Sequence, residues 1–176
     1  GGGYIPPVTH VCTIDRLDFS TETVTIPTPK LSQARGNLAA TSSSSYGYFG
    51  GGRTAPTTYS STIDRLDFST DGVSVSSSKL SQARDGLAAV SYNSTPTFDQ
   101  VDGFQFNISP WSYFGYSVGG FGPAGGSSNI DRIDFATEIV TTPTKLSLAK
   151  SIIGGVQNNF YGYIRSEEHT SELQSH

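Results

Sequence analysis

The dipeptide Asp-Arg recurs three times, each time at the same place in a repeated stretch of sequence. The stretch reads TIDRLDFST at 13–21 and at 62–70, and NIDRIDFAT at 129–137. Charges at one position of every repeat could form a ring that lines a channel. We expect a structural role instead, in which each Arg bridges a carboxylate or backbone carbonyl groups between adjacent repeats. The residues concerned are Asp15, Arg16, Asp64, Arg65, Asp131 and Arg132.

Other residues that could do chemistry are few. A nucleophile needs a base, and His10 is the only His before residue 169. It stands two residues before Cys12, the only Cys, so an internal disulfide and a zinc site built on Cys pairs are excluded. Asp67, Asp71 and Gly72 lack the spacing of a calcium loop and suit a turn. We expect no catalytic residue, no metal and no cofactor.

Composition excludes two classes of partner. The chain has 176 residues and a formal net charge of −4, with ten basic and twelve acidic residues among 1–164. This near-neutral balance lacks the basic excess of a nucleic-acid-binding protein. No apolar run approaches the ~20 residues of a membrane-spanning helix. The sequence contains no Met, and we interpret it as an internal fragment of a longer protein.

Internal repeats organise residues 1–164. KLSQAR occurs at 30–35 and 79–84, and a similar segment, KLSLAK, occurs at 145–150. The repeats divide the chain into three units, roughly 1–49, 50–118 and 119–164, with an inserted segment at 94–111. Each unit offers four short strand candidates separated by turn residues, and no stretch shows a sustained helical apolar pattern. The predicted fold class is all-β.

The repeat resembles the kelch repeat, whose period is about 50 residues. The double glycine after an aromatic strand is matched by Gly51-Gly52 and by Gly119-Gly120, and the Arg before a small apolar strand by Arg35 and Arg84. The usual Trp of the fourth strand is absent, and the third unit has Lys150 in place of the Arg. The resemblance implies a partial β-propeller of about three four-stranded blades. A β-solenoid, the competing architecture, usually has much shorter coils.

The loops that differ between otherwise similar units are the candidates for binding. They read YIPPVTHVC, RTAPTTYSS and FGPAGGSSN. The insertion at 94–111 adds aromatic residues that could bind a protein or a sugar ring, or could fold back onto the blade. The candidate binding residues are Arg53, Tyr59, Phe104, Phe106 and Trp111.

From these features we expect a non-enzymatic scaffold that binds a protein or a glycan and is joined by additional blades of the same parent chain. Near-identical repeats rich in Ser, Thr, Gly and Tyr are typical of surface, secreted or virion proteins. The alternative is the propeller portion of a galactose-oxidase-like or glycan-active enzyme, since copper enzymes of that kind also carry kelch-like blades.

The last twelve residues, 165–176, do not continue the repeat. After the aromatic strand the other units have glycines, whereas Ile164 is followed by RSEEHTSELQSH. These residues resemble the in-frame translation of a common sequencing-library adapter. We expect 165–176 to be a non-native tail that has no function and does not pack on the blades.

Overall fold

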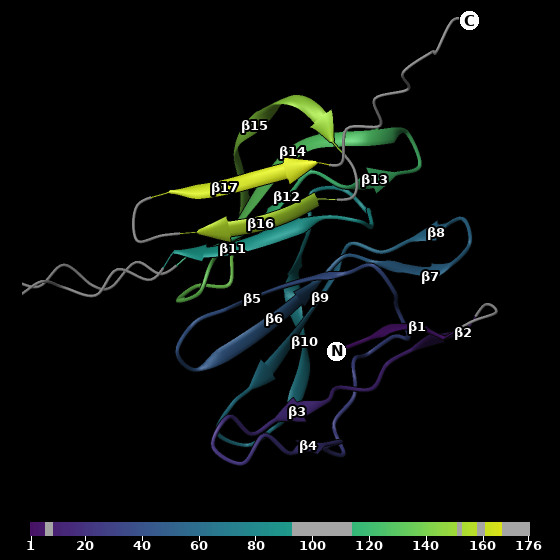
Figure 1. The fold of residues 1–176 in the computed structure, drawn as a ribbon. Helices are drawn as coiled ribbons and strands as arrows, with labels where there is room; N and C mark the ends of the chain where they lie inside the picture. The colour runs from purple at the N-terminus through teal and green to yellow at the C-terminus, as the bar shows by residue number, and fades with distance from the viewer. Residues whose placement is uncertain (6–8, 93–113, 151–152, 158–160, 167–176) are drawn as a thin grey trace, which may run out of the picture.

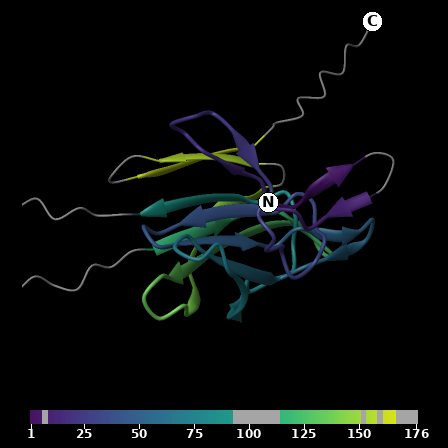
Figure 2. The ribbon, with the colours of Figure 1, turned by 90° about the horizontal axis from the view of Figure 1, so that it is seen from below.

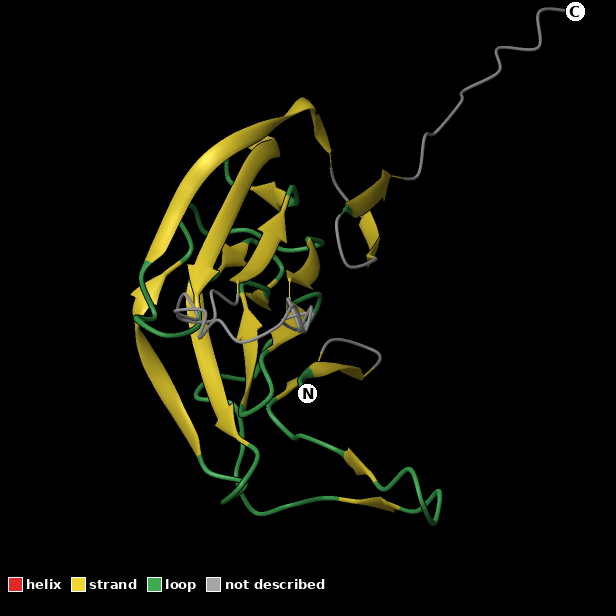
Figure 3. Ribbon diagram, turned by 90° about the vertical axis from the view of Figure 1, so that its left-hand side faces the viewer, coloured by secondary structure: helices red, strands yellow, loops and turns green. Residues whose placement is uncertain are grey.

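The computed structural model describes residues 1–5, 9–92, 114–150, 153–157 and 161–166. These residues form strands joined by turns and loops, and none of them is helical (Figure 3). The described part therefore contains no helix that could cross a membrane. The all-β class predicted from the sequence is confirmed.

The first complete four-stranded sheet is called blade A. Its antiparallel order is β5 (Ala39–Ser42), β6 (Tyr46–Gly50), β9 (Thr62–Asp67) and β10 (Val73–Lys79). Small, aromatic and β-branched residues fill the strands, and Ser, Asp and Gly fill the turns, as expected for short twisted strands. At the β9–β10 turn Asp67 accepts hydrogen bonds from the backbone N–H and the hydroxyl of Ser69, at 2.8 and 2.6 Å.

The second complete sheet, blade B, repeats this arrangement. Its strands are β11 (Ala88–Tyr92), β12 (Phe114–Val118), β14 (Gly125–Asp134) and β15 (Val140–Lys150), again antiparallel in this order. The short strand β13 (Phe121–Gly122) pairs with the start of β14. Ala88 and Ala89 lie in the innermost strand β11, where small side chains allow the neighbouring sheets to approach.

Two hairpins flank the complete blades and lie at opposite ends of the molecule (Figure 1). The N-terminal half-blade consists of β3 (Arg16–Leu17) and β4 (Val24–Thr25). The C-terminal half-blade consists of β16 (Ile153–Gln157) and β17 (Gly162–Ser166). The inner strands β5, β11 and β16 lie side by side, so the sheets follow one another in an open arc.

The ends of the sheets differ from the sequence units. β5 and β6 belong to unit 1–49 apart from Gly50, whereas β9 and β10 belong to unit 50–118, so blade A joins two units. Blade B likewise joins 50–118 to 119–164. The reason is that the repeated glycines, which divide the sequence into units, end the second strand of a blade rather than the blade itself.

The segment 165–176, predicted to be a non-native tail, begins within the last strand of the described chain. Arg165 and Ser166 belong to β17 and pair with Gly154 and Ile153. The first two residues of the segment 165–176 therefore continue the hairpin by backbone pairing, which requires no particular side chain, and the Arg165 side chain is exposed. The remaining residues, 167–176, lie outside the described part of the chain.

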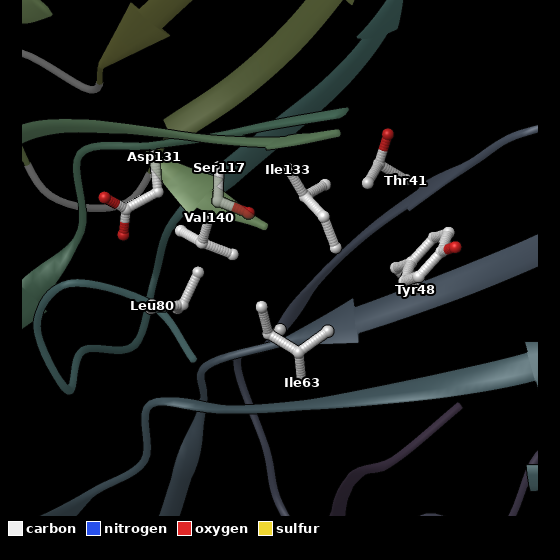
Figure 4. Close-up of a pocket in the computed structure, with 9 residues that line it drawn as sticks. Thr41, Tyr48, Ile63, Leu80, Ser117, Asp131, Ile133 and Val140 are labelled. Carbon is white, nitrogen blue, oxygen red and sulfur yellow. The ribbon is translucent and has the colours of Figure 1, made fainter. Parts of the chain in front are cut away.

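The core lies between blade A and blade B. The ring of Tyr48 stacks on that of Phe135, with centroids 5.0 Å apart. Figure 4 shows how Ile63 and Leu80 from the side of blade A face Ile133 from blade B across a void of only about 10 Å³. Each fully buried aliphatic side chain of this kind contributes about 1.5–3 kcal/mol. The apolar layer thus joins successive blades.

Candidate functional site

Three hairpins of unlike sequence project from the same end of the arc, and together they are called the hairpin rim. β1 (Gly3–Ile5) pairs with β2 (Thr9–Val11), β7 (Arg53–Ala55) pairs with β8 (Thr58–Tyr59), and β13 pairs with β14. All three lie toward the right of Figure 1. Viewed from below in Figure 2, the hairpins of β1–β2 and β7–β8 again extend to the same side. The three variable loops that were predicted to bind a ligand therefore lie on one side of the arc.

The repeated glycine pairs allow this close packing. Gly51 and Gly52 adopt φ of 71° and 96°, and Gly119 and Gly120 adopt 61° and 103°. The Gly52 N–H donates to the carbonyl oxygen of Arg84 at 2.9 Å. A Cβ atom on Gly51 would lie 2.7 Å from the same oxygen. Glycine is therefore required both by the left-handed backbone and by the close approach of the segment KLSQAR at 79–84, which we call a linker.

The first two hairpins border an open pocket of about 260 Å³. Tyr4 and His10 are paired across β1 and β2, and their rings lie 5.7 Å apart with planes tilted by 60°. Asn37 adopts φ of 54° at the pocket, and its Nδ2 donates to Oδ2 of Asp85 at 3.3 Å. The pocket lining consists of Tyr4, His10, Gly36, Asn37, Arg53 and Pro56. Apolar walls with a few convergent polar groups are typical of small-ligand sites.

Arg53, one of the predicted binding residues, is held at the pocket edge from two sides. Its Nε lies 3.2 Å from Oδ2 of Asp85, as an ion pair without hydrogen-bond geometry. Its Nη1 donates to the carbonyl oxygen of Pro56 at 3.2 Å. The Arg53 backbone N–H and C=O also exchange hydrogen bonds with Gly36, at 2.8 and 3.0 Å. These contacts fix the guanidinium while leaving about a third of the side chain exposed.

Tyr59, another predicted binding residue, lies on the rim where the second hairpin meets the third. Its ring centroid is 6.2 Å from that of Phe121, with the planes tilted by 51°. The backbones of Phe121 and Asp85 exchange hydrogen bonds at 2.8 and 2.7 Å. The second and third hairpins are therefore in contact through Tyr59 and Phe121, and the third is also hydrogen-bonded to the segment that contains Asp85. The other predicted binding residues, Phe104, Phe106 and Trp111, lie outside the described residues.

The repeated Asp pairs with the Arg of the preceding linker. Arg35 Nη2 lies 2.5 Å from Asp64 Oδ2, and Arg84 Nη1 lies 3.1 Å from Asp131 Oδ2. The four side chains are 0–1% exposed. Burial lowers the pKa of both Arg side chains, and the adjacent Asp charge opposes this shift. A guanidinium with so high an ordinary pKa remains charged, so the buried pairs are ionic.

The repeated Arg, one residue along, points to the next blade instead. Arg16 Nη1 lies 2.6 Å from Asp71 Oδ2 in the turn of blade A, and Arg65 Nη1 lies 2.6 Å from Glu138 Oε1 in the turn of blade B. The hydrogen bond to Glu138 raises the pKa of Arg65. Strand β9 therefore contributes one charge, Asp64, to its own blade and one, Arg65, to the neighbouring blade.

The ends of the arc lack these partners. Asp15 is exposed in the N-terminal half-blade. The guanidinium carbon of Arg132 lies 4.6 Å from the ring centroid of Phe114, and no carboxylate of the described residues forms an ion pair with it. The six residues of the repeated dipeptide thus occupy equivalent places but do not all have equivalent neighbours.

Several residues of the pocket were not predicted from the sequence. Tyr4 and His10 lie in the loop YIPPVTHVC, which was a binding candidate as a whole, but neither was singled out, and Asn37 and the adjacent Asp85 were not named at all. The pairing of His10 with Tyr4 depends on the register of the β1–β2 hairpin, and that of Asp85 with Arg53 on the placement of a neighbouring linker. Neither follows from local sequence.

Side chains that could ligate a metal are scattered among the described residues. No three His, Cys, Asp or Glu side chains within the described ranges come close enough to hold a metal ion. Cys12 is a free, half-buried thiol. Aromatic rings, an amide and a guanidinium at the hairpin rim can stack on a ligand and hydrogen-bond to it.

No family model and no curated protein matches the chain. Solved structures do match, among them the structure of YjhT, with a TM-score of 0.57 and 14% sequence identity over 85% of this chain. The chain spans 44% of the length of that protein. A likeness at this identity shows the fold alone, and it agrees with the predicted partial β-propeller.

Proposed function

We propose that the chain is part of a non-enzymatic, kelch-like β-propeller that binds a glycan or a protein at the hairpin rim. The observation that carries the proposal is the pocket between the first two hairpins, where Tyr4, Asn37 and Arg53 converge. It supports the proposal because variable loops on a repeated, rigid frame are where binding residues usually lie.

The chemistry of the pocket favours a carbohydrate over a protein loop. Sugar rings present C–H faces that pack on aromatic side chains, together with hydroxyl groups that need hydrogen-bond partners. The rings of Tyr4 and His10 offer a surface on which the C–H face of a sugar can pack. The amide of Asn37 and the guanidinium of Arg53 offer hydrogen-bond partners for its hydroxyl groups. Because Asp85 already fixes Arg53, little side-chain entropy is lost when a ligand binds.

The test is a calorimetric titration of the 176-residue chain with a panel of neutral and acidic oligosaccharides. Tyr4→Ala removes an aromatic wall, and Asn37→Gly removes the amide while tolerating the left-handed backbone. Each variant should weaken binding by about tenfold, the equivalent of about 1.4 kcal/mol. Lys79→Ala, an exposed change at the end of β10, is the control and should leave affinity unchanged.

Circular dichroism of each variant separates loss of binding from loss of fold. Absence of binding by every oligosaccharide, or affinities unaffected by both pocket variants, would contradict the carbohydrate assignment. Binding of a folded protein ligand that is weakened by the same variants would retain the rim as the site and identify the other ligand class.

A further inference from the structure

The pocket at the hairpin rim lies where the repeat has lost a side chain. The segments GNLAA at 36–40 and DGLAA at 85–89 follow the two KLSQAR linkers, so Gly36 is the counterpart of Asp85. A Cβ atom on Gly36 would lie 3.0 Å from Cδ2 of His10, within the lining of the pocket. The missing side chain at position 36 therefore leaves room for a ligand between the first two hairpins.

The carboxylate of Asp85 holds two residues of this pocket without lining it. Its Oδ2 lies 3.2 Å from Nε of Arg53 and accepts a hydrogen bond from Nδ2 of Asn37 at 3.3 Å. The Asp85 side chain is 8% exposed, whereas about a third of Arg53 is exposed. A ligand in the pocket thus meets Arg53 and Asn37, with Asp85 as the buried group that both of them contact.

The guanidinium of Arg53 is poorly arranged to bind an anion. A carboxylate or phosphate binds best to two neighbouring nitrogen atoms of a guanidinium at once. Nε faces Asp85, and Nη1 donates to the carbonyl oxygen of Pro56 at 3.2 Å, so each such pair of nitrogens has one member engaged. Asp85 also compensates the positive charge. An anionic ligand would lose its hydration and be repelled by Asp85, with little net attraction in return.

The hydrogen-bonding groups that remain suit a pair of neighbouring hydroxyl groups. An ionised carboxylate only accepts hydrogen bonds, so the NH₂ group of Asn37 faces Asp85 and its Oδ1 is left as an acceptor. The Nη2 group of Arg53 is left as a donor, since the described contacts use only Nε and Nη1. One sugar hydroxyl can accept from Nη2 while the adjacent hydroxyl donates to Oδ1.

We propose that the pocket is built for a neutral sugar bound through two adjacent hydroxyl groups, and that Asp85 is the residue that excludes acidic sugars. The inference rests on the proposed function and adds to it the class of carbohydrate and a specificity-determining residue. Arg53 and Asn37 contact the sugar. Asp85 acts through them, because it orients both side chains and cancels the charge of the guanidinium.

The test is a calorimetric titration of the full chain with trisaccharides of glucose, mannose and galactose and with the trisaccharides of the corresponding uronic acids. It is made at about pH 8, above the range in which histidine side chains ordinarily gain a proton. At least one neutral trisaccharide should bind, about tenfold or more tightly than its uronate. Its affinity should not change between about 50 and 500 mM NaCl, because no ligand charge is involved.

Two substitutions should shift the preference in opposite directions. Asp85→Asn keeps the shape of the side chain but leaves Arg53 uncompensated, so the affinity for the uronates should rise about tenfold relative to the neutral sugars. Arg53→Gln leaves Asp85 uncompensated and should move the preference further toward neutral sugars. Asp71→Asn removes the same charge from the β9–β10 turn, outside the pocket, and is the matched control that should leave the preference unchanged.

Gly36→Asp tests the place of binding. It introduces at the first junction the residue that stands at the same position of the second, and its Cβ would lie against His10. Binding of every sugar should be lost while circular dichroism shows an unchanged fold. Unchanged binding would place the sugar elsewhere and overturn the inference.

The remaining outcomes separate this inference from the proposed function. Uronates that bind the wild-type chain as tightly as neutral sugars, or a preference that does not respond to Asp85→Asn and Arg53→Gln, would overturn the inference and leave carbohydrate binding intact. Absence of binding by every trisaccharide would overturn both. If Asp85→Asn does not fold, the response to Arg53→Gln and the salt dependence still decide between a neutral and an acidic ligand.

Discussion

Replacing Arg35 by Met should be among the most damaging single changes in blade A. The guanidinium of Arg35 donates to Asp64 at 2.5 Å and to the carbonyl oxygens of Gly51 and Thr62 at 2.7 and 2.8 Å. After the change, the buried carboxylate of Asp64 keeps only the backbone N–H of Ser32, at 3.2 Å. Removing one partner of a fully buried ion pair costs about 3–5 kcal/mol. This is a large part of the 5–15 kcal/mol by which a typical domain is stable.

Urea unfolding followed by circular dichroism, at one fixed protein concentration, measures this cost. Arg16→Met is the matched control, because the Arg16–Asp71 pair has side chains 59% and 32% exposed and should contribute under about 1 kcal/mol. The double variant Arg35→Met, Asp64→Leu should recover much of the loss, since an apolar pair avoids a buried unpaired charge. A single variant no less stable than the control, or a double variant less stable than Arg35→Met alone, would refute the reasoning.

Three further predictions concern the turns and junctions. In urea unfolding, Gly51→Ala should destabilise the chain by about 2 kcal/mol more than Gly125→Ala. Both residues have positive φ, but only at Gly51 would the added Cβ lie 2.7 Å from a backbone oxygen, that of Arg84. The neighbouring serine hydroxyl holds the pKa of Asp67 below 3.8, so its contribution to stability is complete above pH 3.8 and is lost as the pH falls through the lowered pKa. Asp67→Asn should remove this acid dependence, as followed by carboxyl NMR titration and unfolding against pH. A double-mutant cycle on Arg65 and Glu138 should give a coupling free energy of about 0.5 kcal/mol. This coupling should decrease with added salt, because about a third of the Arg65 side chain is exposed. Equal coupling at low and high salt would contradict the ion pair.

The sequence predicted the features that repeat within one chain. The strands, the glycine pairs and the basic residue at the end of each KLSQAR segment recur at fixed positions, and local composition accounts for each of them. The partner of Arg35 could not be predicted, because Asp64 lies 29 residues further along in β9, whereas Arg35 lies before β5. Arrangement of the strands in three dimensions decides that pairing.

One repeated signal in the sequence was interpreted only as a turn. Glu22, Asp71 and Glu138 each stand seven residues after the repeated Asp, and each has a left-handed backbone. Of these, Asp71 was interpreted as a turn residue, but the ion pairs of Asp71 and Glu138 with the preceding blade needed the structure. The pocket at the hairpin rim was less predictable still, because His10 and Arg53 lie in loops that do not repeat and their neighbours come from other loops.

The most direct test of the binding face is the map of backbone amide chemical shifts when the chain is titrated with the oligosaccharide that binds best. The two ends of each blade serve as site and internal control. The account predicts that the shifts concentrate in β1, β2, β7 and β8, with smaller changes in β13. Shifts concentrated at the other end of the blades, in the turns that join β3 to β4, β9 to β10 and β14 to β15, would contradict the account.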